Sequence, residues 1–419
     1  QYEVIEDIRN SLDVLAIQGS GTSISTLTQA GVKDADLLIA LTNVDEINIV
    51  ASMIAKQLGV KSCLARVRNP EYTLPDTPVK LKSLGIDLVI QPEKETAREV
   101  VRLVRYPDAI DVVECSDTHT VIIGLKLPPE TPLKGEQLGI ITQEHLSDIT
   151  FRLVAVSRDN ETYIPGGKFV LQSGDLIYFI CHKQDIERIF NLVGREYRMA
   201  RDVMILGGGY VSELVAQELE REKGYRVKLV ESDWEKSHHA AELLTTTMVV
   251  KSKEMADVDL LTVEGLPDMD VFAALSDDDE NNIVTSLLAR HLRVKRIITR
   301  VDKLQYLPIA RAIGLDITIN EHIITADAIL SFLKGSSVLN VVKLRGLKAE
   351  IIELDVGPQS KVVRKALKDV SFPKGLLVGA IVHNGRTSIA VGNSVIEPRD
   401  RVIVFVEEQV KGEVEKYFL

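Results

Sequence analysis

The chain contains an internal duplication, and this repeat constrains its fold more than any other feature. The segment from Asp34 to Tyr72 aligns without a gap with the segment from Asp268 to Tyr306, at a constant offset of 234 positions. The two segments share 17 identities in 39 positions. Unrelated segments would share only a few, so one structural unit occurs twice in this chain.

Each copy divides into a larger α/β front lobe and a smaller, strand-rich back lobe. The back lobes match at an offset of 225, where Asp175 answers Asp400. In the second back lobe, Asn384-Gly385 lies between two β-type runs, which predicts a hairpin. We therefore expect a first front lobe over residues 1–110, a first back lobe over 111–198, a second front lobe over 199–335 and a second back lobe over 336–419.

The second front lobe shows the order strand, Gly-rich turn, helix, strand, acidic residue. Asp202–Leu206 has β character, Tyr210–Glu222 has apolar residues at helical spacing, and Arg226–Val230 predicts the next strand. Strands and helices alternate after that. The pattern predicts a Rossmann-like, doubly wound parallel sheet with helices on both faces, while the back lobes are of the α+β class.

The Gly-rich turn, Gly207-Gly208-Gly209-Tyr210-Val211-Ser212, fits a dinucleotide-binding fingerprint in which Ser212 replaces the last glycine. Such a turn lets the backbone approach a pyrophosphate at a helix N-terminus. Glu231, 24 positions after Gly207, would accept hydrogen bonds from both ribose hydroxyls and repel a 2′-phosphate. NAD(H) or an adenine nucleotide is favoured over NADP(H). A purely structural turn is the alternative.

A second candidate site is the repeated strand end. Thr42 and Ser276 each follow a predicted strand and precede an Asp three residues on, a spacing that resembles a helix capping box. Capping and ligand contact can coexist, because the carboxyl edge of a parallel sheet is where ligands bind. Arg66 and Arg300 end the next strands, Ser62–Arg66 and Arg296–Arg300. Each could bind phosphate or form a salt bridge with the acidic turn.

The first copy carries its own Gly-rich turn, Gly19-Ser20-Gly21, against which an adenine could lie. The matching turn of the second copy, Ser252-Lys253-Glu254, has no glycine. The counterpart of Gly207–Gly209 would precede residue 1, and Glu6 resembles the counterpart of Glu231. We expect on this basis that a strand, a turn and part of a helix are missing near the start of the first copy. Either residues have been omitted from the given sequence, or the protein itself is truncated there.

Composition excludes several classes of protein. The net charge of −11 argues against nucleic-acid binding. Three cysteines without metal-ligand spacing exclude a disulfide scaffold and a cysteine-type zinc site. No apolar run approaches the length that spans a bilayer. The acidic run from Asp277 to Glu280 could bind a metal ion, but its unbroken carboxylates fit a solvated first turn of a helix better. Motifs of catalysis are absent, so we expect a sensor and not an enzyme.

These residues resemble the regulatory subunits of Trk-type potassium uptake systems, which are built from two RCK (KTN) domains. The likeness rests on DADLLIALTNVDEINIVASMIAKQLG, on VMILGGGYVSELVAQELE with VKLVE, and on the arginines that close SCLAR and RIITR. It covers nearly the whole chain. The resemblance implies nucleotide contacts at Gly207, Gly208, Gly209, Tyr210, Val211, Glu231, Ser276, Asp277 and Arg300, and at Thr42, Asn43 and Arg66 in the first copy.

The resemblance also implies a cytosolic protein at the inner face of the membrane, assembled as a tetrameric ring. The ring would bind NAD(H), ATP or ADP and gate a membrane potassium-translocating subunit. Three alternatives stay open: the regulatory part of a cation antiporter or another potassium channel, an NAD-dependent oxidoreductase, and a structural oligomer whose sites bind nothing.

Overall fold

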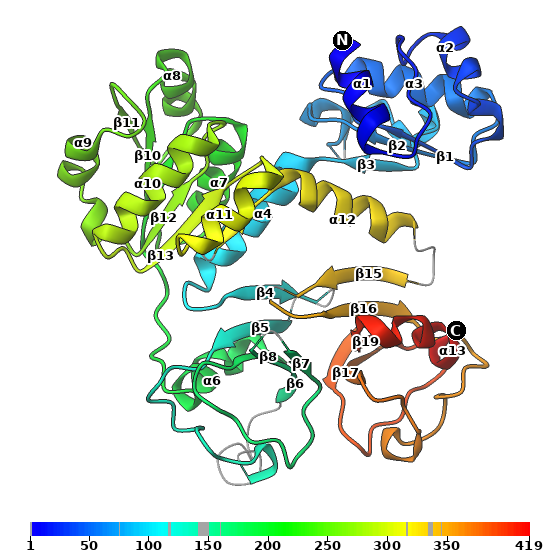
Figure 1. Cartoon of the computed structure of the whole chain (residues 1–419), viewed down its shortest axis with the longest axis vertical. Helices are drawn as coiled ribbons and strands as arrows, with labels where there is room; N and C mark the ends of the chain where they lie inside the picture. The colour runs from blue at the N-terminus through cyan, green and yellow to red at the C-terminus, as the bar shows by residue number, and fades with distance from the viewer. Residues whose placement is uncertain are drawn as a thin grey trace. The chain divides into compact units, whose positions relative to one another are not determined.

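The computed structural model describes residues 2–74, 76–115, 119–140, 151–159, 161–315, 317–333, 338–344 and 346–419. The chain forms two compact units, residues 1–95 and residues 96–419. The first unit covers the first 95 residues of the expected first front lobe. The second unit contains the second front lobe and both back lobes (Figure 1).

The first unit is a three-stranded parallel sheet with helices. The strand order is β1-β2-β3, and all pairings are parallel. Ala55 and Cys63 lie in one buried cluster, and Ile49 and Ala65 lie in a second. The elements are α1 (Tyr2–Ser11), α2 (Ile24–Gln29), β1 (Leu37–Ala40), α3 (Asp45–Gln57), β2 (Ser62–Arg66), β3 (Leu88–Ile90) and the start of α4 (Pro92–Arg105).

The second front lobe is a six-stranded parallel sheet of order β11-β10-β9-β12-β13-β14. This is the doubly wound order, which reverses direction between β9 and β12. The elements are β9 (Asp202–Leu206), α7 (Tyr210–Arg221), β10 (Arg226–Glu231), α8 (Trp234–Leu243), β11 (Met248–Lys251), α9 (Val258–Val263), β12 (Val271–Ala274), α10 (Asp279–His291), β13 (Arg296–Arg300), α11 (Leu307–Ala312), β14 (Thr318–Ile319) and α12 (Glu321–Leu333).

Helices cover both faces of this sheet because successive side chains of a strand point to opposite sides. Val203 and Ile205 of β9 pack with residues of α7 and of the second half of α4. Met204 and Leu206 of the same strand pack with residues of α9 and α10. The continuous apolar runs of the sequence therefore reflect strands that are buried on both faces.

The repeat explains the first unit. Its three described strands match β12, β13 and β14, and α1 matches α8 with a shift of two residues. Glu6 lies inside helix α1 and not at a strand end, so its proposed equivalence with Glu231 is wrong. The spacing from α1 to β1 matches the spacing from α8 to β12 to within two residues. The shortening that we expected near the start of the first copy is therefore absent between these elements.

The two back lobes share one topology. Both are five-stranded antiparallel sheets with orders β4-β5-β8-β6-β7 and β15-β16-β19-β17-β18. The predicted hairpin is confirmed: His383 pairs with Arg386 across Asn384-Gly385, and both turn residues have positive φ. The strands are β4 (Asp111–Glu114), β5 (Thr120–Lys126), β6 (Phe151–Arg158), β7 (Glu161–Tyr163), β8 (Leu176–His182), β15 (Val338–Lys343), β16 (Ala349–Asp355), β17 (Leu376–His383), β18 (Arg386–Ile389) and β19 (Arg401–Glu407).

The back lobes pack against each other through one shared core. Tyr178 and Ile180 of the first lobe lie in the same buried cluster as Ile403 and Phe405 of the second. Helices follow the last strand of each sheet, and they are α6 (Ile186–Leu192) and α13 (Val414–Phe418). In the part of the chain that the structure describes, no helix combines the length and the apolar character that crossing a membrane requires.

A carboxylate holds one turn of the second front lobe. Glu220 of α7 accepts hydrogen bonds from the backbone N–H groups of Thr245, Thr246 and Thr247, which join α8 to β11. Burial raises the pKa of this carboxyl group, but the three donors outweigh that effect and lower the pKa to about 2.

We predict that Glu220→Gln lowers the free energy of unfolding of the second front lobe by about 1 kcal/mol at pH 7, a value discounted for partial exposure. Because the folded pKa lies below the unfolded one, the difference is complete above about pH 4.5 and is lost as pH falls towards 2. Urea unfolding followed by Trp234 fluorescence measures it, since Trp234 is the only tryptophan. A loss equal to that of Glu218→Gln would contradict the prediction.

Candidate functional site

The candidate site of the second front lobe lies at the carboxyl edge of its sheet, beside the point where the strand order reverses. The Gly-rich turn follows β9, Glu231 ends β10, Ser276 and Asp277 follow β12, and Arg300 ends β13. Side chains from four neighbouring strands therefore meet at one edge. In doubly wound folds this edge is where ligands bind.

The Gly-rich turn fits closely against its neighbours. Gly207 has a φ of 106°, and a Cβ there would lie 2.8 Å from the backbone nitrogen of Ser276. A Cβ on Gly208 would lie 2.9 Å from Cγ of Glu231. Gly209 is the N-cap residue of α7, which no side chain caps. The first two positions therefore require glycine, and the start of α7 presents backbone N–H groups.

The other residues of the turn contribute in different ways. Tyr210 begins α7 and is half-buried, whereas the side chain of Val211 is buried in the core shared with α4. Val211 can thus offer a ligand only its backbone N–H group. Ser212 is fully buried, as expected for the position where the helix packs on the strand.

Glu231 is buried and accepts hydrogen bonds from the backbone around it. One carboxylate oxygen accepts from the N–H of Gly208, and the other accepts from the N–H groups of Ser232 and Asp233. The acid predicted to bind ribose hydroxyls therefore also fixes the Gly-rich turn relative to the end of β10.

Two buried asparagines that are identical in the repeat, Asn48 and Asn282, organise the repeated strand ends, a role that the sequence did not predict. The Asn282 side-chain oxygen accepts from the N–H and hydroxyl of Ser276 at 3.0 and 2.7 Å, and its nitrogen donates to the carbonyls of Ser276 and Arg300 at 2.9 and 3.1 Å. Asn48 makes the same four bonds with Thr42 and Arg66. Their identity in both copies was the available signal.

The capping-box interpretation of the strand ends is wrong. The cap of α10 is Asp278, whose side chain accepts from the N–H of Asn281 at 2.9 Å. Asp279 instead accepts from the backbone N–H groups of Asp302 and Lys303. Ser276 and Thr42 bond to the buried asparagines, and α3 has no side-chain cap.

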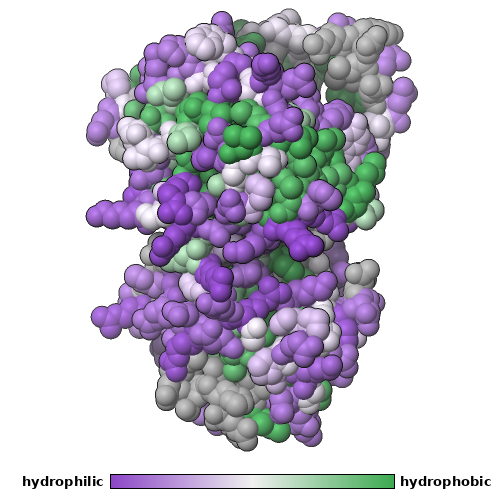
Figure 2. Space-filling model, turned by 90° about the vertical axis from the view of Figure 1, so that its left-hand side faces the viewer, coloured by the Kyte–Doolittle hydropathy of each residue, from purple (hydrophilic) through white to green (hydrophobic). Residues whose placement is uncertain are grey.

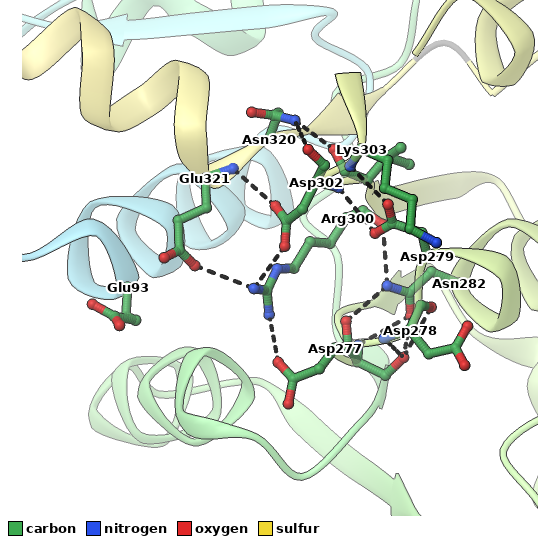
Figure 3. Close-up of polar contacts among 12 residues, drawn as sticks. Glu93, Asp277, Asp278, Asp279, Asn282, Arg300, Asp302, Lys303, Asn320 and Glu321 are labelled. Carbon is green, nitrogen blue, oxygen red and sulfur yellow. Dashed lines mark hydrogen bonds and ion pairs between the residues drawn. The ribbon is translucent and has the colours of Figure 1, made fainter. Parts of the chain in front are cut away.

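Arg300 is surrounded by three carboxylates (Figure 3). Its guanidinium contacts Asp277 at 3.1 Å, Asp302 at 2.8 Å and Glu321 at 3.2 Å, and its side chain is 12% exposed. Burial acts to lower the pKa of Arg300, but the nearby carboxylates outweigh it and raise the pKa. The salt-bridge alternative is therefore realised, and phosphate binding by Arg300 stays a prediction.

In the first unit, Thr42, Asn43 and Arg66 come together in the same way. Arg66 donates to the side-chain oxygen of Asn43 at 3.0 Å and contacts Glu93 at 2.5 Å. Arg68 contacts the same carboxylate. Burial acts to raise the pKa of Glu93, but hydrogen bonds from Arg66 and Arg68 hold it below its usual range. Asn43 stands where the second copy has Asp277.

Gly19, Ser20 and Gly21 form the turn that precedes α2. A Cβ on Gly19 would clash with the side chain of Thr26 at 2.5 Å, and Ser20 bonds to the Thr22 hydroxyl at 2.9 Å. A Cβ on Gly21 would meet Ile47 of α3. The close contact at Gly19 gives a packing reason for that glycine, and adenine binding at this turn stays a prediction.

The acidic run from Asp277 to Glu280 serves four separate contacts. Asp277 pairs with Arg300 and Lys236, Asp278 caps α10, Asp279 holds the turn after β13, and Glu280 contacts Lys303 and Tyr306. Within the described ranges, no group of three or more His, Cys, Asp or Glu residues is arranged to hold a metal ion.

The fold and this edge define a class of protein: a tandem pair of Rossmann-like front lobes, each followed by an antiparallel back lobe. The TrkA-N domain family matches residues 1–92 and 203–321, and the TrkA-C domain family matches residues 122–194 and 351–419. The chain belongs to the TrkA family.

Relatives and solved structures agree with this placement. The Trk system potassium uptake protein TrkA homolog 1 of Methanosarcina mazei is 32% identical over 98% of this chain and 91% of its own length. The TrkA protein of Halomonas elongata is 32% identical over 99% of this chain and 91% of its own. The GsuK channel bound to NAD has a TM-score of 0.60 at 18% identity, covering 100% of this chain and 73% of the channel chain, and so shares the fold.

We predict that Asn282→Ala destabilises the second front lobe by about 2–4 kcal/mol, because it leaves buried backbone groups of Ser276 and Arg300 without their partner. Urea unfolding followed by Trp234 fluorescence measures the loss. Asn281→Ala, at a half-buried neighbour, is the matched control and should cost under about 0.5 kcal/mol. Equal losses in the two variants would show that the Asn282 amide does not hold the strand ends.

Proposed function

We propose that the chain is the cytosolic, nucleotide-sensing regulatory subunit of a Trk-type potassium uptake system and gates its membrane subunit. The observation that carries the proposal is the carboxyl edge of the second front lobe. There an uncapped Gly-rich turn, a buried acid at the end of β10 and an arginine at the end of β13 converge in a chain of the TrkA family.

The ligand that this edge fits best is NAD(H) or an adenine nucleotide such as ATP or ADP. Backbone N–H groups at the start of α7 suit a pyrophosphate, and Glu231 suits ribose hydroxyls while repelling a 2′-phosphate. The GsuK channel, which shares this fold, binds NAD, which supports a dinucleotide as the kind of ligand. In the first unit, Thr42, Asn43 and Arg66 would contact a nucleotide. Its adenine would lie against the turn formed by Gly19, Ser20 and Gly21.

The proposal includes assembly into a homotetrameric ring at the inner face of the membrane, and exposed apolar residues that recur in the repeat support contacts between copies. Val50 of α3 and Val284 of α10 occupy equivalent positions, and both are exposed, 40% and 56%. Figure 2 shows hydrophobic side chains gathered over the upper part of one face. Exposed apolar residues of the second front lobe also include Leu304 and Ile309. Such surfaces mark interaction sites.

Regulation on this proposal requires no reaction. A nucleotide shifts the ring between two states only by its different affinity for them, and the ring transmits that shift to the membrane subunit. The sequence carries none of the acid–base motifs that a hydride-transfer enzyme needs near its substrate, which disfavours an oxidoreductase. Regulation of a cation antiporter or another channel is the second candidate, since the GsuK channel shares the fold.

We predict saturable binding of at least one of NADH, NAD⁺, ATP and ADP to the full chain by isothermal titration. Arg300→Ala and Glu231→Ala should each weaken binding about tenfold or more, because each removes a charged hydrogen-bonding partner. Arg311→Ala, an exposed arginine of α11, is the control and should leave affinity unchanged.

The same samples test catalysis. NADH absorbance should stay constant with candidate carbonyl substrates, and turnover would favour the oxidoreductase. Binding of none of the four nucleotides would refute nucleotide sensing and leave a structural oligomer.

A further inference from the structure

Asp277 occupies an unusual place between the Gly-rich turn and two cations. Its carboxylate lies 3.2 Å from Nζ of Lys236 on α8 and 3.1 Å from Nη1 of Arg300. A Cβ on Gly209 would meet the same carboxylate at 3.6 Å. An anion of the protein itself therefore sits beside the turn that presents N–H groups for a phosphate.

Of the three carboxylates that contact Arg300, that of Asp277 is the one most easily displaced from the guanidinium. Its side chain is 64% exposed, whereas the other two acids on Arg300, Asp302 and Glu321, are 24% and 12% exposed. Burial acts to raise the pKa of Asp277, but Lys236 and Arg300 outweigh it and hold the pKa below its usual range, so the group stays ionised. Lys236 in turn has a raised pKa, because Asp277 outweighs its burial.

The first copy lacks this charge. Asn43 takes the position of Asp277, and its neutral amide oxygen makes the equivalent contact with Arg66 at 3.0 Å. The backbone of the strand end is the same in both copies, because Asn48 and Asn282 hold it in the same way. The repeat has thus kept the geometry at this position and changed the charge.

We infer that Asp277 is a specificity-determining residue whose carboxylate occupies the position of a ligand phosphate. An incoming nucleotide displaces this carboxylate, and its phosphate then binds Lys236. Lys236 is thus a phosphate-binding residue of the second front lobe. This inference rests on the proposed nucleotide sensing. Displacement exchanges one anion for another on Lys236 and Arg300. The displaced carboxylate stays nearby and repels the ligand in proportion to the ligand's negative charge.

Asp277 consequently biases the second front lobe towards the less charged dinucleotide. ADP carries more negative charge than NADH, so ADP suffers more from the nearby carboxylate. Lys236 offsets part of this cost once it is released.

The test is Asp277→Asn, which installs the residue that the first copy already carries. Affinities for ADP and NADH are measured without divalent metal, by isothermal titration and by fluorescence of Trp234. Trp234, the only tryptophan of the sequence, is 68% exposed at the start of α8, the helix that also carries Lys236. Its fluorescence therefore reports on the second front lobe. We expect ADP to bind about three- to tenfold more tightly, with a smaller gain for NADH.

A double-mutant cycle with Lys236→Met tests the displacement. Lys236→Met should weaken ADP binding more in the Asp277→Asn background than in the wild-type chain, because Lys236 is then free for the ligand from the start. Glu242→Gln removes one negative charge from an exposed site on α8 and controls for net charge alone. It should leave the ratio of ADP to NADH affinity unchanged.

The outcomes separate this inference from the proposed function. If wild-type chain binds a nucleotide and Asp277→Asn binds ADP no more tightly, Asp277 does not compete with the ligand and the inference fails alone. An equal gain in Glu242→Gln would likewise overturn it. If neither the wild-type chain nor Asp277→Asn binds ADP or NADH, the proposal of nucleotide sensing by the second front lobe is itself refuted.

Discussion

The carboxyl edge of each front lobe depends on one buried asparagine. Asn282 ties the end of β12 to the end of β13, and Asn48 ties β1 to β2 with the same four hydrogen bonds. Both side chains are fully buried, so an unsatisfied partner would cost a large part of the lobe's stability. The backbone of Arg300 and Arg66 is thereby fixed. A ligand that bound there would find the edge already ordered, so binding would not have to offset the entropy cost of ordering these residues.

The polar groups at this edge are already engaged by the protein itself. Glu231 accepts from the turn at Gly208, Asp277 lies beside Gly209, and Arg300 pairs with three carboxylates. On the proposed function, nucleotide binding would exchange these partners for groups of the ligand, and its free energy would be a small difference between large electrostatic contributions. Such a balance suits a sensor, because modest changes in ligand charge change which state is favoured.

Much of the fold followed from the sequence, because strands buried on both faces leave continuous apolar runs. β9, β2 and β13 have the predicted bounds, and the Gly-rich turn lies where the motif placed it. The roles of Asn282 and Asp279 did not follow, because each also bonds to backbone groups 18 to 24 positions away that only the folded sheet brings near. The Glu6 assignment failed because a short charged helix was interpreted as a strand end. The arrangement of the residues around Val211 and Gly21 does not indicate whether they contact a ligand, so these contacts stay predictions.

Amide hydrogen exchange with and without saturating NADH or ADP tests most directly whether a nucleotide binds at the carboxyl edge. Nucleotide binding there predicts slower exchange in peptides that span Gly207–Val211 and Ser276–Asp279, with little change in the back-lobe strands β17 and β19 of a single chain. Saturable binding that leaves both peptides unprotected would place the ligand elsewhere and contradict the assignment of this edge as the sensing site.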